Sequence, residues 1–146
     1  MLGAISNKSY RRYAEVIDNV LGPPVVAEDE QKEKDPAGLD QHEPGAKLDD
    51  GKPRPDLVLG DFARALQSVV DVGTYGANKY SEHGWLSVKE GVIRYEDAMM
   101  RHYLKLKAGE ELDGKSGLMH RAQIAWNALA SLELYLKDQE AAEANG

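Results

Sequence analysis

The stretch LMHRAQIAWNALASLELYLK, residues 118–137, decides the fold of this chain. Its apolar residues recur at helical spacing and gather on one side: Leu118, Ala122, Ala125, Leu129, Leu132 and Leu136. The opposite side carries uncharged hydrogen-bonding residues: His120, Gln123, Asn127 and Ser131. A solvated face usually shows Lys and Glu, so we expect both sides to be partly buried, with the leucine side in the core. The polar side then either lines a pocket or meets another helix.

A second helix precedes this one, and a capping box marks its start. Ser87 and Glu90 stand three residues apart, and the helix that they open ends at Ala108–Gly109. Its core stripe is Val92, Tyr95, Met99, Tyr103 and Leu106. Another face carries basic residues: Arg94, Arg101 and Lys105. Asp97 is within reach of both arginines, so one option is that this face is a solvated surface with a helix ion pair. The other option is that the two arginines clamp a phosphate group.

The remaining helix of the main body is predicted from Asp61, as its cap, to Lys79. Strand-like alternation is absent from the sequence, so we predict an all-α fold. The expected architecture is a compact bundle of three principal helices plus a short N-terminal helix. Three helices leave a wide apolar surface uncovered, and we therefore expect the chain to form oligomers.

The chain divides into four predicted segments. Residues 1–22 form an amphipathic helix whose stripe is Tyr13, Val16, Ile17, Val20 and Leu21. Residues 23–44 form an acidic flexible linker, and residues 45–140 form the helical domain. Residues 141–146 are predicted to be a disordered tail.

Composition narrows the function classes. The chain has 146 residues, no cysteine and a net charge of −7. A general nucleic-acid binder needs a basic surface, so that class is not favoured. The absence of cysteine excludes disulfides and thiolate metal sites and fits a reducing cytoplasm. No apolar run is long enough to cross a membrane, and no membrane partner is expected.

The segment GAKLDDGKPRPDL, residues 45–57, repeats basic residues between glycines and prolines. It is either a solvated linker or a loop that wraps an anionic ligand through Lys47, Lys52 and Arg54. The basic residues follow directly after an acidic run, and this placement favours contact with phosphate.

Two interhelical loops hold further candidates. TYGANKYSEHGW, residues 74–85, brings aromatic rings for stacking on a base close to a Lys for its phosphate. The rings belong to Tyr75, Tyr80 and Trp85, and they also suit plugging a helix end. In the second loop, Asp113 belongs to a turn and offers a hard oxygen ligand for Mg²⁺, with His120 one loop away.

Residues 45–137 resemble the phage-encoded N-terminal type of dATP/dGTP diphosphohydrolase domain, a relative of the all-α MazG-like nucleotide pyrophosphohydrolases. The matching motifs are KLDDGKPRPDL, TYGANKY followed by Trp85, RYEDAMMRH and ELDGKSGLMHRAQIAWNALASLEL. The resemblance implies an interhelical pocket for a small nucleotide in a homo-oligomer, in the cytoplasm of an infected bacterium if the protein is phage-encoded. It also implies hydrolysis of dGTP or dATP to monophosphate and pyrophosphate, assisted by Mg²⁺ or Mn²⁺.

The candidate residues follow from these patterns and from the resemblance. The catalytic candidates are Asp97 and His120, and the metal candidates are Asp97, Asp113 and His120. The phosphate candidates are Lys47, Lys52, Arg54, Lys79, Arg94 and Arg101. The base candidates are Tyr75, Tyr80, Trp85, His102 and Asn127.

Three functions stay open at this point. The first is a metal-dependent (d)NTP pyrophosphohydrolase. The second is a non-catalytic sponge that sequesters a nucleotide or a cyclic-nucleotide immune signal. It is favoured by few carboxylates together with many Arg, Lys and aromatic groups. The long helices also lack the ExxE motif of MazG-like enzymes and place His120 and Gln123 where ExxD is expected. The third is an interaction module that dimerises through the N-terminal helix.

Overall fold

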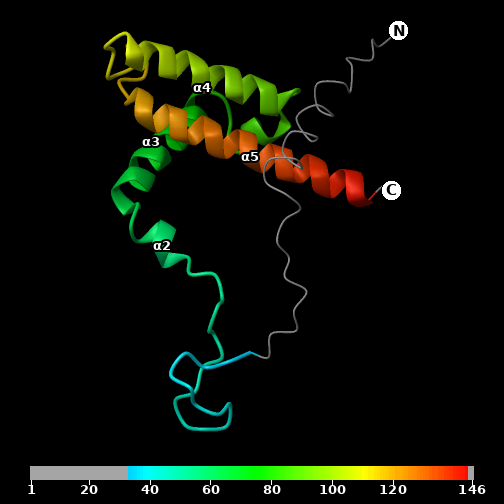
Figure 1. The fold of residues 1–146 in the computed structure, drawn as a ribbon. Helices are drawn as coiled ribbons and strands as arrows, with labels where there is room; N and C mark the ends of the chain where they lie inside the picture. Colours follow the sequence, from blue (N-terminus) through cyan, green and yellow to red (C-terminus); the bar gives the residue numbers. More distant parts are fainter. Residues whose placement is uncertain (1–32, 145–146) are drawn as a thin grey trace. The chain divides into compact units, whose positions relative to one another are not determined.

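Helices form the framework of the computed structural model, which describes residues 33–144. Their order is α2 Asp56–Leu59, α3 Ala63–Lys79, the 3₁₀ helix η1 Gly84–Ser87, α4 Gly91–Lys107 and α5 His120–Ala144 (Figure 1). These residues contain no strand, only an isolated bridge between Leu112 and Met119. The predicted all-α class is confirmed, and the helix predicted for residues 1–22 lies outside the described residues.

The chain forms two units, residues 1–52 and residues 53–146. In the described part of the first unit, residues 33–52, turns surround the carboxylate of Asp35. That carboxylate accepts hydrogen bonds from the backbone N–H groups of Ala37 at 2.8 Å and Lys47 at 2.7 Å. Residues 33–44 of the predicted acidic linker therefore include turns with specific backbone hydrogen bonds. All of the helices described below belong to the second unit.

Both predicted helix caps are wrong. The N–H of Phe62 donates to the carbonyl of Val58 at 3.0 Å, so the turn after α2 continues past Asp61. Phe62 occupies the N-cap of α3 instead, without a side-chain cap. Ser87 ends η1, and the N-cap of α4 is Glu90 in the left-handed region at φ 55°. The capping box fails because α4 begins only at Gly91.

The last helix is longer than predicted. α5 passes the expected end at Lys137 and continues to Ala144, so residues 141–144 are helical rather than a disordered tail. The extension is rich in Ala, Glu and Gln, which are good helix formers. It also places Glu140 and Glu143 on one face of α5 in an ExxE arrangement that a helix ending at Lys137 lacks.

α5 is the central helix, because it packs against both α4 and α3 (Figure 1). The buried apolar residues are Val72 of α3, Val92 of α4, and Ala122, Ala130 and Leu134 of α5. The polar side of α5 is buried against α4, with His120, Asn127 and Ser131 fully or nearly inaccessible. The predicted contact of the polar side with another helix is therefore confirmed. The prediction of a leucine side in the core is wrong at three positions, because Leu129, Leu132 and Leu136 are about half exposed.

Small residues explain which side of α5 meets α4. A Cβ at Gly91 in α4 would run into the side chain of Leu134 on α5. Such residues let two helix backbones approach closely. Two polar groups on this side also find partners on α4: the Ser131 hydroxyl donates to the Glu96 carboxylate at 3.2 Å, and the rings of His120 and His102 share a hydrogen bond. Close packing and these interhelical hydrogen bonds together outweigh the leucine pattern.

The leucine side of α5 instead lines a groove shared with α3 and η1. Trp85, Tyr95 and Trp126 form a mutual edge-to-face cluster, with ring centroids 5.5–6.4 Å apart. Both tryptophans line the groove, which has a volume of about 570 Å³. Its lining is mainly apolar and includes Val69, Val70, Leu129, Leu132 and Leu136, together with Glu133 and Lys137.

No helix within residues 33–144 has both the length and the apolar character that a membrane span requires.

Candidate functional site

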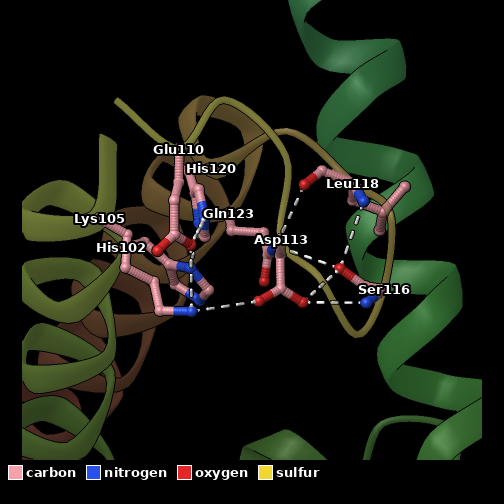
Figure 2. Close-up of polar contacts among 8 residues, drawn as sticks. All are labelled: His102, Lys105, Glu110, Asp113, Ser116, Leu118, His120 and Gln123. Carbon is pink, nitrogen blue, oxygen red and sulfur yellow. Dashed lines mark hydrogen bonds and ion pairs between the residues drawn. The ribbon is translucent and has the colours of Figure 1, made fainter. Parts of the chain in front are cut away.

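The loop between α4 and α5 folds around the side chain of Asp113. Its carboxylate accepts hydrogen bonds from the backbone N–H and the hydroxyl of Ser116, at 2.9 and 2.8 Å (Figure 2). The backbone N–H of Asp113 donates to the carbonyl of Leu118 at 2.9 Å, which closes the loop. Burial raises the pKa of Asp113, but the hydrogen bonds from Ser116 outweigh it and the pKa lies below its usual value. Asp113 is therefore a fixed negative charge at this end of the bundle.

Two histidines from different helices meet next to this loop. His102 on α4 and His120 at the start of α5 have their Nδ1 atoms 2.9 Å apart (Figure 2). His120 is completely buried, whereas His102 is partly exposed. An Nδ1···Nδ1 hydrogen bond requires one donor and one acceptor, so the pair shares a single proton at this contact.

The other nitrogen of His120 faces a carboxylate without reaching it. His120 Nε2 is buried and has no hydrogen-bond partner among the described residues. Glu110 Oε2 lies 3.6 Å from it, beyond hydrogen-bond distance. Lys105 on α4 stands between the two acids, with its Nζ 3.5 Å from Glu110 and 3.8 Å from Asp113 (Figure 2). We name His102, Lys105, Glu110, Asp113 and His120 the histidine cluster.

The charges around His102 favour its neutral form. Burial lowers its pKa most, and His120 lowers it further. Lys105 and Arg101 act in the same direction, whereas Asp113 opposes them and raises the pKa. His102 is therefore an uncharged imidazole at neutral pH, beside two cations and one carboxylate.

The C-terminal end of α3 brings a further cation to this region. Lys79 Nζ lies over the rings of Tyr75 and Tyr80, 5.9 and 5.1 Å from their centroids. A hydrogen bond with Tyr80 raises the pKa of Lys79 most, and the charge of Asp113 adds to the effect. The structure thus brings together three predicted residues, and it leaves 78% of Tyr80 exposed.

Two other predicted base contacts have internal partners. Trp85 packs edge-on against Tyr95 and Trp126 in the groove, which is the structural role that large aromatic residues also fill. Asn127 is 6% exposed, and its side chain donates to the carbonyl of Gln123 at 2.7 Å. Neither side chain belongs to the histidine cluster.

The basic residues predicted for phosphate are spread over both units. Lys47 and Lys52 lie in the first unit, where they pair with Asp49 at 3.0 Å and Glu33 at 2.7 Å. Arg54 is exposed near the start of the second unit.

The polar face predicted on α4 is exposed, including its acid Asp97. Arg94 donates to the carbonyl of Lys89 at 3.4 Å, near the N-terminal end of the helix. Arg101 lies next to His102 in the chain, and its charge acts on that ring. The two arginines therefore have different surroundings, and only Arg101 belongs to the neighbourhood of the histidine cluster.

The donor set does not fit a divalent metal ion. Within residues 33–144, no three His, Asp or Glu side chains come together as ligands for one ion. The three metal candidates illustrate why: Asp97 is exposed on α4, and His120 engages His102 through Nδ1. Asp113 accepts from Ser116 and faces the Lys105 ammonium, which repels a cation.

Sequence patterns missed two members of the histidine cluster as site residues. Lys105 appears in the sequence only as one of three basic residues on a helix face. Glu110 lies in a loop that reads as an ordinary turn. Their position in the chain could have indicated them, because both residues lie between His102 and His120, which are candidates already.

Comparison with known proteins matches residues 42–144 to the family described as dATP/dGTP diphosphohydrolase, N-terminal. This range contains the whole histidine cluster. A dATP/dGTP diphosphohydrolase from Salmonella phage PMBT28 is 32% identical to the chain over 81 residues. The match covers 56% of this chain and 26% of that relative, so the chain spans about a quarter of the relative's length. No solved structure matches.

Proposed function

Because this chain belongs to the dATP/dGTP diphosphohydrolase N-terminal family, we propose that it binds a purine deoxynucleoside triphosphate and hydrolyses it to monophosphate and pyrophosphate. The observation that carries the proposal is the histidine cluster. It combines neutral imidazole, carboxylate and ammonium groups at one end of the bundle. Such a mixture of bases and cations suits hydrolysis of a phosphoanhydride better than simple packing of helices.

The surrounding cations support a phosphate position beside the cluster. Lys105, Arg101 and Lys79 all act electrostatically on His102 or Asp113, although they come from two helices. A triphosphate placed there would gain charge-assisted hydrogen bonds that a neutral ligand cannot make. The exposed rings of Tyr75 and Tyr80 next to Lys79 offer a stacking surface for the base.

Sequestration without hydrolysis is the second candidate. It is favoured by the absence of a three-ligand metal cluster among the described residues. In this function the same cations hold a nucleotide or a cyclic nucleotide that leaves unchanged. Mg²⁺ or Mn²⁺ remains an assay component for the first candidate, brought by the triphosphate rather than by a site on the chain.

One experiment separates the two candidates. The full chain is incubated with dGTP, dATP and a cyclic dinucleotide, with and without Mn²⁺, while products and binding are measured together. Release of pyrophosphate from dGTP or dATP supports the hydrolase. Tight binding with the ligand recovered intact after denaturation supports sequestration and rejects hydrolysis.

Replacement of Arg101 tests the phosphate position. Arg101→Ala removes a charge beside His102, and we expect the affinity for dGTP to fall at least tenfold, about 1.4 kcal/mol. Arg64→Ala is the matched control, since Arg64 is exposed at the opposite end of α3. Calorimetric titration of both variants gives the comparison. Equal affinities would place the triphosphate elsewhere.

We also propose that a second copy of this chain fills the groove between α3 and α5. Leu129, Leu132 and Leu136 are about half exposed there, although they form a continuous apolar stripe. Glu133 and Lys137 line the same groove and carry opposite charges. In a two-fold interface each contact occurs twice with the roles exchanged, so Glu133 of each copy can face Lys137 of the other.

A further inference from the structure

The surroundings of His120 fix the position of its proton. Its Nε2 is buried, and Glu110 is the acid that faces it at 3.6 Å. A lone pair on Nε2 would point at a negative charge inside the protein, whereas an N–H there is attracted to it. A small rotation of the half-exposed Glu110 side chain would also give the N–H its hydrogen bond. In a neutral His120 ring the proton is therefore on Nε2, and Nδ1 holds the lone pair.

The proton position of His102 then follows from the hydrogen bond between the rings. The two Nδ1 atoms are 2.9 Å apart, and His120 Nδ1 can only accept. His102 must therefore donate from Nδ1, which leaves the lone pair of the neutral ring on Nε2. His102 Nε2 has no hydrogen-bond partner among the described residues, and His102 is partly exposed. The hydrogen bond between the rings thus leaves a basic nitrogen on a partly exposed residue.

We propose that His102 Nε2 is the general base that activates the attacking water in this site. The inference rests on the proposed function and deepens it. In the reaction, the water oxygen bonds to the α-phosphorus while one water proton passes to His102 Nε2. The bond from the α-phosphorus to the bridging oxygen breaks, and that oxygen leaves with pyrophosphate. His120 and Glu110 are positioning residues, because they set the orientation and tautomer of His102 without touching the substrate.

Two cations, Lys105 and Arg101, lie near the proposed base and are available to bind the substrate phosphate. Lys105 lies 3.5 Å from Glu110 and 3.8 Å from Asp113, and Arg101 adjoins His102 in the chain. A phosphate that binds Lys105 competes with Glu110 for the ammonium and frees the carboxylate to approach His120. Substrate binding then strengthens the tautomer that the base needs. The groups facing His102 are Arg101 and Lys105 on α4, Asp113 in the loop and His120 on α5.

Nitrogen NMR of the full chain without nucleotide tests the tautomers directly. Long-range ¹⁵N–¹H correlation spectra distinguish a protonated from an unprotonated ring nitrogen. We expect His120 as the Nε2–H form and His102 as the Nδ1–H form. A spectrum with the proton of His102 on Nε2 overturns the proposal, whatever the activity.

Kinetics with matched variants test the catalytic role. His102→Asn keeps an amide N–H that can donate to His120 and removes only the base. We expect kcat to fall at least a hundredfold with KM changed less than threefold, the range for loss of a general base. Glu110→Gln removes the charge that orients His120, and we expect a smaller fall of about tenfold in kcat. Glu111→Gln, its exposed neighbour, is the control and should retain the wild-type kcat.

The outcomes separate this inference from the function beneath it. Absence of nucleotide hydrolysis by the wild-type chain overturns both the proposed function and the role of His102. Hydrolysis that survives His102→Asn with an unchanged kcat overturns the role of His102 alone. Loss of kcat in His102→Asn and Glu110→Gln, with Glu111→Gln unaffected, supports it.

Discussion

The neutral state of His102 makes a measurable difference to stability as the pH falls. Its pKa is lowered from 6.5, chiefly by burial, so the unfolded chain binds a proton there more readily than the folded chain. The contribution of neutral His102 to stability is therefore present above pH 6.5 and lost as the pH falls through the lower folded pKa. We expect the free energy of unfolding to decline between pH 7.5 and 5.5.

His102→Gln should remove part of this decline, because Gln does not titrate. Urea unfolding followed by circular dichroism at several pH values gives the comparison. His42→Gln, at an exposed position of the first unit, is the control and should follow the wild-type curve. Identical pH dependence in all three proteins would mean that folding does not lower the pKa of His102.

For single residues, the sequence predicts which members of the histidine cluster lie near one another but not which side chains make contact. His120 and Asp113 could be predicted as neighbours because only a short loop separates them. The contact between His120 and His102 depends on how α4 and α5 pack, which no local pattern shows. Glu110 comes within 3.6 Å of His120 in a loop that contains Gly109 and Gly117, both with positive φ.

The packing of α5 against its neighbours depends on a small side chain at a buried position, Ala130. Ala130→Leu would force extra volume into a buried position of α5 that borders the groove, and we expect a loss of about 1–3 kcal/mol. Ala128→Leu is the matched control, because Ala128 is exposed on the same helix and Leu has high helix propensity. Thermal unfolding of the two variants should show a lower Tm only for Ala130→Leu.

The packing of α5 also shows which features of the helices could be predicted from the sequence. The type and approximate extent of α3, α4 and α5 follow from helical periodicity, and each is confirmed. The buried side of α5 does not follow, since six apolar residues outnumber the polar ones on the opposite side. Burial was decided by hydrogen bonds of His120 and Ser131 to α4, and such long-range pairs have no signature in α5 alone.

Exchanging the two charged residues of the groove, Glu133 and Lys137, tests whether the chain self-associates. Glu133→Lys and Lys137→Glu each place like charges against each other in a two-fold interface, so we expect each single variant to dissociate. Mixing the two variants pairs opposite charges again, and a heterodimer should form. Light scattering after size-exclusion chromatography measures the mass of each sample.

A second variant tests the apolar part of the groove. Leu132→Glu buries a charge if the groove is an interface, and we expect loss of association. Leu104→Glu is the control, because Leu104 is 67% exposed on α4 and does not line the groove. Equal masses for both variants at every concentration would show that the groove does not hold a second copy.

The aromatic cluster gives this molecule a built-in optical reporter. The sequence contains two tryptophans, and both Trp85 and Trp126 line the groove. Tryptophan emission, excited selectively over tyrosine, therefore comes entirely from that surface, without a label or an engineered fluorophore. Its wavelength should shift to the red as the protein is diluted and the groove becomes hydrated. The unmodified chain can thus report its own assembly while nucleotide is added at the other end of α5.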